Sequence, residues 1–246
     1  MKLQMDFTTD PGKNFGVILP LTDRVLALPN PVDVWLPQPT AQNMVIEGGR
    51  VSSWIGRRNG RSLAHAVAAR RPRPENGLLR FSSDALGNEA QLDLAGAAIG
   101  QQSAFTIAVH GRIHPEQLSF DNQYFLGSSV SGAMARIAYR FTNGTRYIRY
   151  QTDDNSLTLD APLPLDWNGI VGVVAVIDGL NIRIDLTTGG TNSRLLTVPF
   201  NLQSFMVGAA ATLGSTGSLR GYIGNLGLWT RAVTTTERAM LLRWVQ

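Results

Sequence analysis

Residues 168–190 read NGIVGVVAVIDGLNIRIDLTTGG and describe two strands joined by a tight turn. An unbroken apolar run, 170–177, leads into Asp178 and Gly179, after which apolar and polar residues alternate over 180–186. Asp-Gly supplies the positive φ values that a two-residue hairpin turn needs. The first strand is apolar on both faces and the second on only one, which is typical of stacked sheets with a dry layer between them. We therefore predict an all-β protein built of packed antiparallel sheets.

The rest of the chain repeats this pattern of short strands and turns. Asn143-Gly144 marks a second hairpin, because this dipeptide favours the turn that joins two strands. Thr234 and Glu237 form a capping box ahead of apolar residues at helical spacing, so a short C-terminal helix is expected. A helical turn is also expected within 63–69. The predicted strands are 32–36, 44–46, 51–55, 78–81, 91–94, 104–113, 136–141, 147–150, 157–159, 170–177, 180–186, 195–200, 205–210 and 221–230.

Composition limits both the class of protein and its chemistry. A chain of 246 residues, 43% of them hydrophobic, is long enough for one large β-sandwich with an appendage. It holds no cysteine, which excludes disulfide bonds and thiolate chemistry. No apolar run approaches the roughly 20 residues that cross a bilayer, so no membrane partner is expected. Residues 1–7 lack the apolar core of a secretory signal, and we expect folding in the cytoplasm.

Residues 1–30 are predicted to form an extended N-terminal arm, and residues 31–246 the β-domain. Breaks such as Asp10-Pro11-Gly12 interrupt regular structure in the arm. Its apolar content is nevertheless too high for a segment surrounded by solvent, so it should cover its own domain, a sister subunit or another protein. The apolar arm residues expected to bind a partner are Phe15, Val17, Ile18, Leu19 and Leu21.

Two blocks of sequence connect the β-domain with a known family. The first, 51–63, contains Trp54 and an Asn-Gly turn and is followed by a second turn within 73–81. The other, 221–238, joins a long strand to the start of the helix. Over roughly residues 32–246 they resemble concanavalin A-like, laminin-G-type jelly-roll domains. The resemblance implies a two-sheet antiparallel jelly roll. It also implies a setting, since cysteine-free domains of this kind are common among tailed-bacteriophage virion proteins.

The resemblance and the arm together lead to a hypothesis about function. They favour a non-enzymatic virion structural protein of a tailed bacteriophage, a decoration or fibre-type subunit attached through its arm. Its expected partners are capsid or tail subunits and further copies of itself, because an arm that crosses onto neighbours adds contact area without enlarging the core. The alternative is a lectin-like carbohydrate-binding module that recognises surface glycans. Nucleic acid is not an expected partner.

Catalysis is not expected, because the residues that it needs are scattered. Some related jelly rolls cleave glycans, which requires two carboxylates held about 5–9 Å apart. No two of the five glutamates lie within one predicted strand, and a strand through Asp153 and Asp154 would send them to opposite faces. His110 and His114 flank a strand end, which does not bring them together around a metal. No catalytic residue and no cofactor are predicted.

Calcium is the metal left open, since many laminin-G-type domains hold one ion at a loop rim. Such an ion needs several oxygen ligands. The candidate ligands are Asp121, Asp153 and Asp154, and turn formation explains these residues equally well.

Two groups of side chains are candidate contact surfaces. One is a predicted basic loop, whose Arg57, Arg58 and Arg61 would bind an acidic partner. The alternative is that these arginines are only solvated. A second region combines aromatic residues with arginines, and aromatic rings stack on sugars while arginine reaches hydroxyl or acidic groups. Ordinary cross-strand pairing is the alternative explanation. The candidate glycan contacts are Tyr139, Tyr147, Tyr150 and Trp167.

Overall fold

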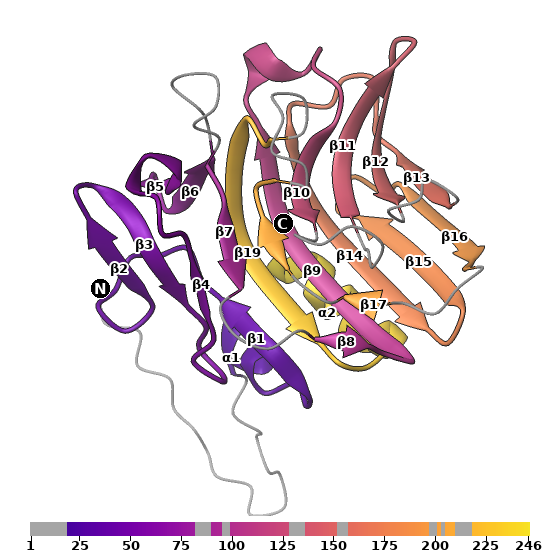
Figure 1. The fold of residues 1–246 in the computed structure, drawn as a ribbon. Coiled ribbons are helices and arrows are strands. Elements are labelled where there is room, and N and C mark those ends of the chain that lie inside the picture. The colour runs from indigo at the N-terminus through magenta and orange to yellow at the C-terminus, as the bar shows by residue number, and fades with distance from the viewer. Residues whose placement is uncertain are drawn as a thin grey trace, which may run out of the picture.

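Two antiparallel sheets packed face to face form the body of the protein (Figure 1). The structure, a computed structural model, describes residues 19–81, 90–94, 99–127, 136–151, 157–196, 201–202, 205–209 and 218–246. Within these residues the architecture is the all-β jelly-roll sandwich that the sequence predicts, with a short helix near the C-terminus.

The first sheet is built around its long central strand, residues 104–113. Both neighbours of that strand pair with it along most of its length, and all three are buried on both faces. Burial of both faces explains the apolar sequence of β14, in which residues 171–177 are all buried. Among the described residues the strand order is β16 (Thr191–Leu195), β15 (Asn181–Leu186), β14 (Ile170–Asp178), β9 (Ala104–Ile113), β19 (Gly221–Trp229), β6 (Leu78–Phe81) and β5 (Arg73–Glu75), with β1 (Pro31–Trp35) also paired to β19.

The second sheet packs on the first and mixes early and late parts of the chain. In the described residues its order is β13 (Thr158–Pro162), β12 (Thr145–Gln151), β11 (Arg136–Thr142), β10 (Gln123–Gly127), β18 (Met206–Val207), β7 (Leu92–Leu94), β4 (Ser62–Ala64), β3 (Arg50–Ile55) and β2 (Met44–Glu47). A small additional pair joins β8 (Gly100–Gln101) to β17 (Asn201–Leu202). Two 3-10 turns, η1 (Ala68–Arg70) and η2 (Pro115–Gln117), complete the connections.

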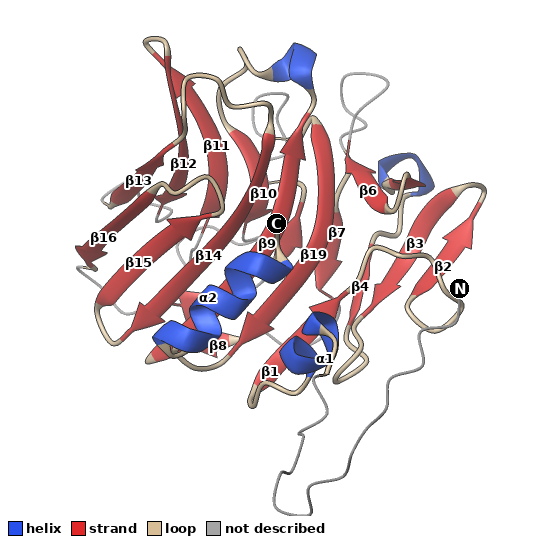
Figure 2. Ribbon diagram, turned by 180° about the vertical axis from the view of Figure 1, so that it is seen from behind, coloured by secondary structure: helices blue, strands red, loops and turns tan. Residues whose placement is uncertain are grey.

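Two helices cover part of the outer face of the first sheet. Figure 2 shows α2 (Thr235–Trp244) lying across β14, β9 and β19, with α1 (Leu21–Leu26) beside β1. The helices contact each other. Gly172 of β14 lets the end of α2 approach, because a Cβ atom there would lie 2.3 Å from the carbonyl oxygen of Val245. A second hydrophobic core therefore lies outside the sandwich.

Helix α1 lies within the segment predicted to be an arm. Val25 is fully buried and Leu28 nearly so, and Leu21 packs against the same outer core. Residues 21–28 therefore cover their own domain, which is one of the three roles the sequence allowed. Leu19 is exposed. Phe15, Val17 and Ile18 lie outside the described residues.

The start of α2 is fixed by the capping box that the sequence predicts. The Thr234 hydroxyl accepts a hydrogen bond from the Glu237 amide, and the Glu237 carboxylate accepts one from the Thr234 amide. Arg231 also donates two hydrogen bonds to this carboxylate, at 2.7 and 2.9 Å. Chiefly because of Arg231, and against a smaller effect of burial, the pKa of Glu237 falls to about 2.

Acid should remove the stabilisation that Glu237 provides. This contribution is complete above the ordinary glutamate pKa of 4.5 and is lost as the pH falls towards the folded value of about 2. We expect Glu237→Gln to have a lower thermal midpoint than the parent protein at pH 7. The difference between the two midpoints should close by pH 2. Thermal unfolding followed by circular dichroism at pH 7, 5, 3 and 2 measures this, with exposed Glu116→Gln as the control. A gap that stays constant with pH contradicts the assignment.

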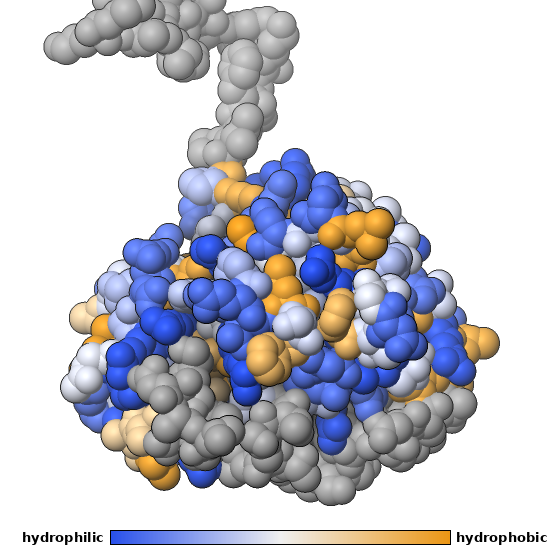
Figure 3. All heavy atoms as spheres, turned by 90° about the horizontal axis from the view of Figure 1, so that it is seen from above, coloured by the Kyte–Doolittle hydropathy of each residue, from blue (hydrophilic) through white to orange (hydrophobic). Residues whose placement is uncertain are grey.

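The surface at one end of the sandwich is mixed rather than uniformly apolar. Seen from above, hydrophilic residues predominate and hydrophobic areas are scattered among them (Figure 3). In the described part of the chain, no helix has the length and apolarity needed to cross a membrane.

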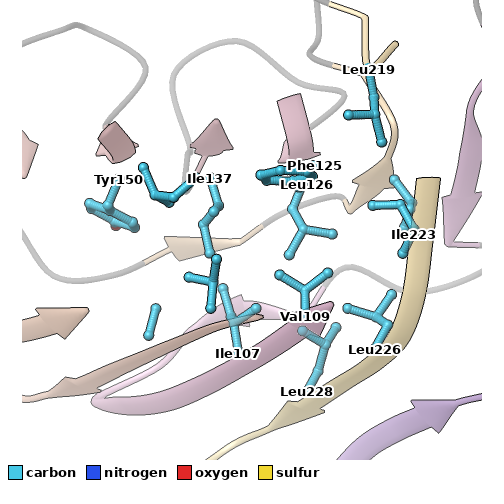
Figure 4. Packing of buried hydrophobic residues seen from close by; sticks show 14 of the residues in the cluster. Ile107, Val109, Phe125, Leu126, Ile137, Tyr150, Leu219, Ile223, Leu226 and Leu228 are labelled. Atoms are coloured by element: carbon cyan, nitrogen blue, oxygen red, sulfur yellow. The ribbon is translucent and has the colours of Figure 1, made fainter. Parts of the chain in front are cut away.

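The main core lies between the two sheets. Figure 4 shows Ile107, Val109, Leu226 and Leu228 of the first sheet facing side chains of the second across this layer. Tyr150 of β12 points into the same layer. Burial of these apolar side chains is the main stabilising term of the sandwich.

Candidate functional site

The outer face of the second sheet carries a row of polar side chains at β11. Successive residues of a strand point to opposite faces. Ile137 and Tyr139 are fully buried in the core between the sheets, so Arg136, Ala138 and Arg140 occupy the opposite face. The arginines of this strand therefore lie outside the sandwich, while its tyrosine lies inside.

The neighbouring strands extend this face and border an open pocket on it. Directly paired residues share a face of the sheet. Arg149 of β12 lies opposite Ala138, and Gln151 lies between Arg136 and Thr158 of the two adjacent strands. Together these side chains surround a hollow of about 520 Å³, the outer-face pocket, which is lined by Asn122, Tyr124, Arg136, Arg140, Arg149, Gln151 and Thr158.

Two arginines of the outer-face pocket are held by aspartates. Arg140 donates from Nε and Nη2 to the two carboxylate oxygens of Asp121, at 2.6 and 2.9 Å. Arg149 donates from the same atoms to Asp160, at 2.6 and 2.7 Å. Such paired bonds fix the plane of each guanidinium group. The pocket therefore presents donors whose direction is set before any ligand arrives.

The pKa values are consistent with these ion pairs. Burial acts to raise the pKa of Asp121, but the hydrogen bonds from Arg140 and the Phe141 amide outweigh it and lower the pKa. The hydrogen bonds to Asp160 raise the pKa of Arg149. Both shifts favour the charged forms, the Asp121 carboxylate and the Arg149 guanidinium.

Aromatic rings lie in and beside the outer-face pocket: Tyr124 lines it, and Tyr147 lies next to Arg149. Tyr124 and Ala138 form a small buried cluster of their own on this face. The Arg136 guanidinium lies 5.7 Å from the centre of the Tyr124 ring, and the Arg149 guanidinium lies 5.1 Å from that of Tyr147. These contacts hold the arginine side chains against the sheet.

Three of the four predicted glycan contacts, Tyr139, Tyr150 and Trp167, lie in the core between the sheets. The Tyr139 hydroxyl donates to the Leu118 carbonyl, and its ring lies 5.2 Å from that of Trp167, which is only 5% exposed. Tyr150 is 1% exposed and points between the sheets (Figure 4). A ring buried in this way has no face on which a sugar can stack. Tyr147 lies half-buried beside the outer-face pocket.

The pocket also contains residues that sequence reasoning did not select, namely Asn122, Tyr124, Gln151 and Thr158. A usable signal was present, because alternation along β11 places Arg136 and Arg140 on the face opposite Tyr139. Grouping arginines with inward-facing tyrosines ignored that alternation.

The calcium candidates do not form a described ion site. Asp121 binds Arg140 with both carboxylate oxygens. Asp153 and Asp154 lie outside the described residues. Within the part of the chain that the structure describes, no group of three or more histidine or acidic side chains is placed to hold a metal.

Hydrogen bonds to a buried carboxylate hold the predicted basic loop in place. Asp33 of β1 is fully buried and accepts hydrogen bonds from the amides of Arg58, Asn59 and Arg61, at 2.8, 3.2 and 2.8 Å. Its own neighbour Val34 donates a fourth, at 2.8 Å. We call residues 56–61 with Asp33 the carboxylate-clamped loop.

The side chains of the carboxylate-clamped loop face solvent. Arg57 and Arg58 are exposed and Arg61 is half-buried, and Arg57 donates to Gln42 at 3.2 Å. A Cβ atom on Gly56 would lie 2.0 Å from the Asp33 carboxylate, so the loop needs glycine there. The loop is therefore a rigid support for exposed arginines, and their predicted acidic partner stays a prediction.

Comparisons with known proteins identify the fold. No protein-family model matches the sequence, and no curated protein matches it either. The binding domain of Paraclostridial mosquitocidal protein 1 is similar, with a TM-score of 0.60 at 12% identity over 91% of this chain and 52% of that one. Botulinum neurotoxin type C has a TM-score of 0.59 at 7% identity, over 88% of this chain and 51% of that one. Trypanosoma rangeli sialidase has a TM-score of 0.55 at 14% identity, over 83% of this chain and 33% of that one. The chain thus spans about half the length of the toxin structures, and at these identities the likeness shows that it shares their β-sandwich fold.

Proposed function

We propose that this chain is a non-catalytic carbohydrate-binding module whose ligand occupies the outer-face pocket. The observation that carries the proposal is the pocket itself, which combines oriented guanidinium groups, amides, hydroxyls and a tyrosine on a rigid sheet. A sugar offers many hydroxyl groups in fixed directions, so it is recognised by donors and acceptors that are also fixed.

The ion pairs suit the recognition of hydroxyl groups. Each of the Asp121–Arg140 and Asp160–Arg149 pairs combines donors and acceptors at nearly neutral net charge. Arg140, Arg149 and Asp160 lie on strands, and Asp121 lies two residues before β10, so the sheet maintains their positions when the pocket is empty. A sugar would therefore bind without reorganisation of the sheet.

The structural neighbours support a binding role. The mosquitocidal protein structure is a binding domain, and the uptake of botulinum neurotoxin type C by cells depends on interaction with two ganglioside molecules. Because this chain spans about half of each structure, their ligands are a guide to chemical class only. These neighbours bear on the glycan hypothesis; attachment to a virion and assembly with copies of itself stay predictions from the sequence.

Glycan-array binding by the purified full chain tests the proposal. We expect binding to a defined set of glycans, reduced at least about tenfold by Arg149→Ala because its oriented hydrogen bonds are lost. Exposed Arg57→Ala, at a distance from the pocket, is the matched control and should bind as the parent protein does.

Two results would contradict the proposal. One is an array without signal for the folded parent protein. The other is equal loss of binding in Arg149→Ala and Arg57→Ala, which would indicate general charge attraction instead of the pocket. Thr158→Ala provides a milder second variant, and circular dichroism confirms that each variant is folded.

A further inference from the structure

A second cleft lies on the opposite side of the molecule, beside α2. Figure 2 shows α2 covering β14, β9 and β19, while β15 and β16 lie to its side. Between the start of the helix and these strands is a hollow of about 480 Å³, the helix-side cleft. Its lining includes Val176, Asp178, Arg183, Leu195, Val233 and Arg238.

One wall of the helix-side cleft carries a surplus of positive charge. Asp185 is 7% exposed and accepts from Arg183 at 2.8–3.0 Å and from the Thr191 hydroxyl at 2.9 Å. Arg238 of α2 shares the same carboxylate, with Nε 3.2 Å from Oδ2. Two guanidinium groups thus share one carboxylate. The Arg183 side chain is 42% exposed, so part of its guanidinium stays accessible.

The other wall is apolar. Val176 and Val233 are buried beneath the cleft, and Leu195 of β16 is 65% exposed at its edge. Exposure of a large apolar side chain to water is unfavourable, so a ligand that covers Leu195 would gain free energy of binding. Asp178 is exposed at the end of β14, where solvent screens its charge.

We propose that the helix-side cleft binds a small amphipathic carboxylate. The carboxylate of the ligand would pair with Arg183 and Arg238, since a guanidinium group matches a carboxylate in plane and in spacing. The hydrocarbon part would cover Leu195 and Val233. The volume of the cleft lies within the range of sites for small ligands. This site is independent of the glycan proposal, because it lies on the other sheet.

Isothermal titration calorimetry of the full chain with butanoate, hexanoate and octanoate tests this. Each added methylene should tighten binding roughly threefold to fourfold until the cleft is filled. Octanoate should also bind more tightly than 1-octanol, which has the same chain length without the charge. Arg183→Gln should weaken octanoate at least about fivefold and leave 1-octanol unchanged, while Leu195→Ser should weaken both.

Arg57→Gln is the control, as an exposed arginine outside the cleft, and should leave both ligands unaffected. Leu195 is exposed, so Leu195→Ser keeps the test valid if Arg183→Gln fails to fold. The proposal is overturned if octanoate does not bind, if it binds no better than 1-octanol, or if the folded variants bind like the parent protein.

Discussion

Asp33→Ala is expected to lower the free energy of unfolding by about 4 kcal/mol or more. The buried carboxylate accepts four backbone amides, three of them from the carboxylate-clamped loop. A hydrogen bond to a charged group contributes roughly 1.5–3 kcal/mol, and an amide left buried without a partner costs about as much. Alanine would remove every acceptor at once, and the loop would have to open so that water can reach these amides.

Urea unfolding followed by tryptophan fluorescence measures this change. Exposed Asp23→Ala in α1 is the matched control and should shift stability by less than about 1 kcal/mol. Asp33→Asn keeps the shape of the side chain, but its amino group would face amide donors, so it should also be clearly destabilised. If Asp33→Ala were no worse than Asp23→Ala, the clamp would have no energetic importance.

Tyr150→Ala is expected to destabilise the protein by about 3–5 kcal/mol, because a large aromatic side chain would be removed from a fully packed core. Tyr150 is 1% exposed and lies between the sheets beside Ile137. Its burial also raises the pKa of its hydroxyl strongly. Loss of glycan binding in this variant would therefore report unfolding rather than a missing contact.

Tyr150→Phe separates the two explanations. It keeps the ring in the core, so both stability and glycan binding should stay close to those of the parent protein. Arg149→Ala, one residue away on the opposite face, should instead lose binding while the protein remains folded. Denaturant unfolding and the glycan array, run on all three variants, distinguish packing from recognition. Reduced glycan binding by a fully stable Tyr150→Phe would contradict the core assignment.

Much of the fold was predictable, because its signals are local. Asn143-Gly144 is the two-residue turn between β11 and β12, with positive φ at both residues. The hairpin of β14 and β15 is also present, but its turn is Gly179-Leu180, one position later than predicted, because Asp178 ends β14 and pairs with Asn181; Gly179 has positive φ. The capping box at Thr234 is also confirmed. Each of these features depends on two to four neighbouring residues, so sequence alone carries the information.

Helix α1 was not predictable in the same way. It has six residues and no side-chain cap, and prolines at positions 20 and 29 favour an irregular segment. Its stability comes from Val25 packing into the outer core next to α2, more than 200 residues away in the sequence. Such a contact overrides local preference and leaves no local pattern.

The candidate site was partly visible in the sequence, but residues of two opposite faces were grouped together. The sequence drew attention to the right hairpin, β11 with β12, because tyrosines and arginines crowd there. The alternation of strand residues also separates Arg149 from Tyr150. Which face of the hairpin meets the other sheet depends on packing across the sandwich. Asn122, just before β10, and Thr158, in β13, join the pocket because these strands pair with the two sides of the hairpin, and the register of that pairing is not visible in the sequence.

The position of β19 bears on how the protein is made. This strand, residues 221–229, pairs with three partners that the ribosome releases much earlier, β1, β6 and β9. Until β19 emerges, those partners present unpaired edges to other nascent chains. High contact order of this kind is associated with slow folding. Chaperone supply and growth temperature should therefore govern the yield of this protein in a producing cell more strongly than its final stability does.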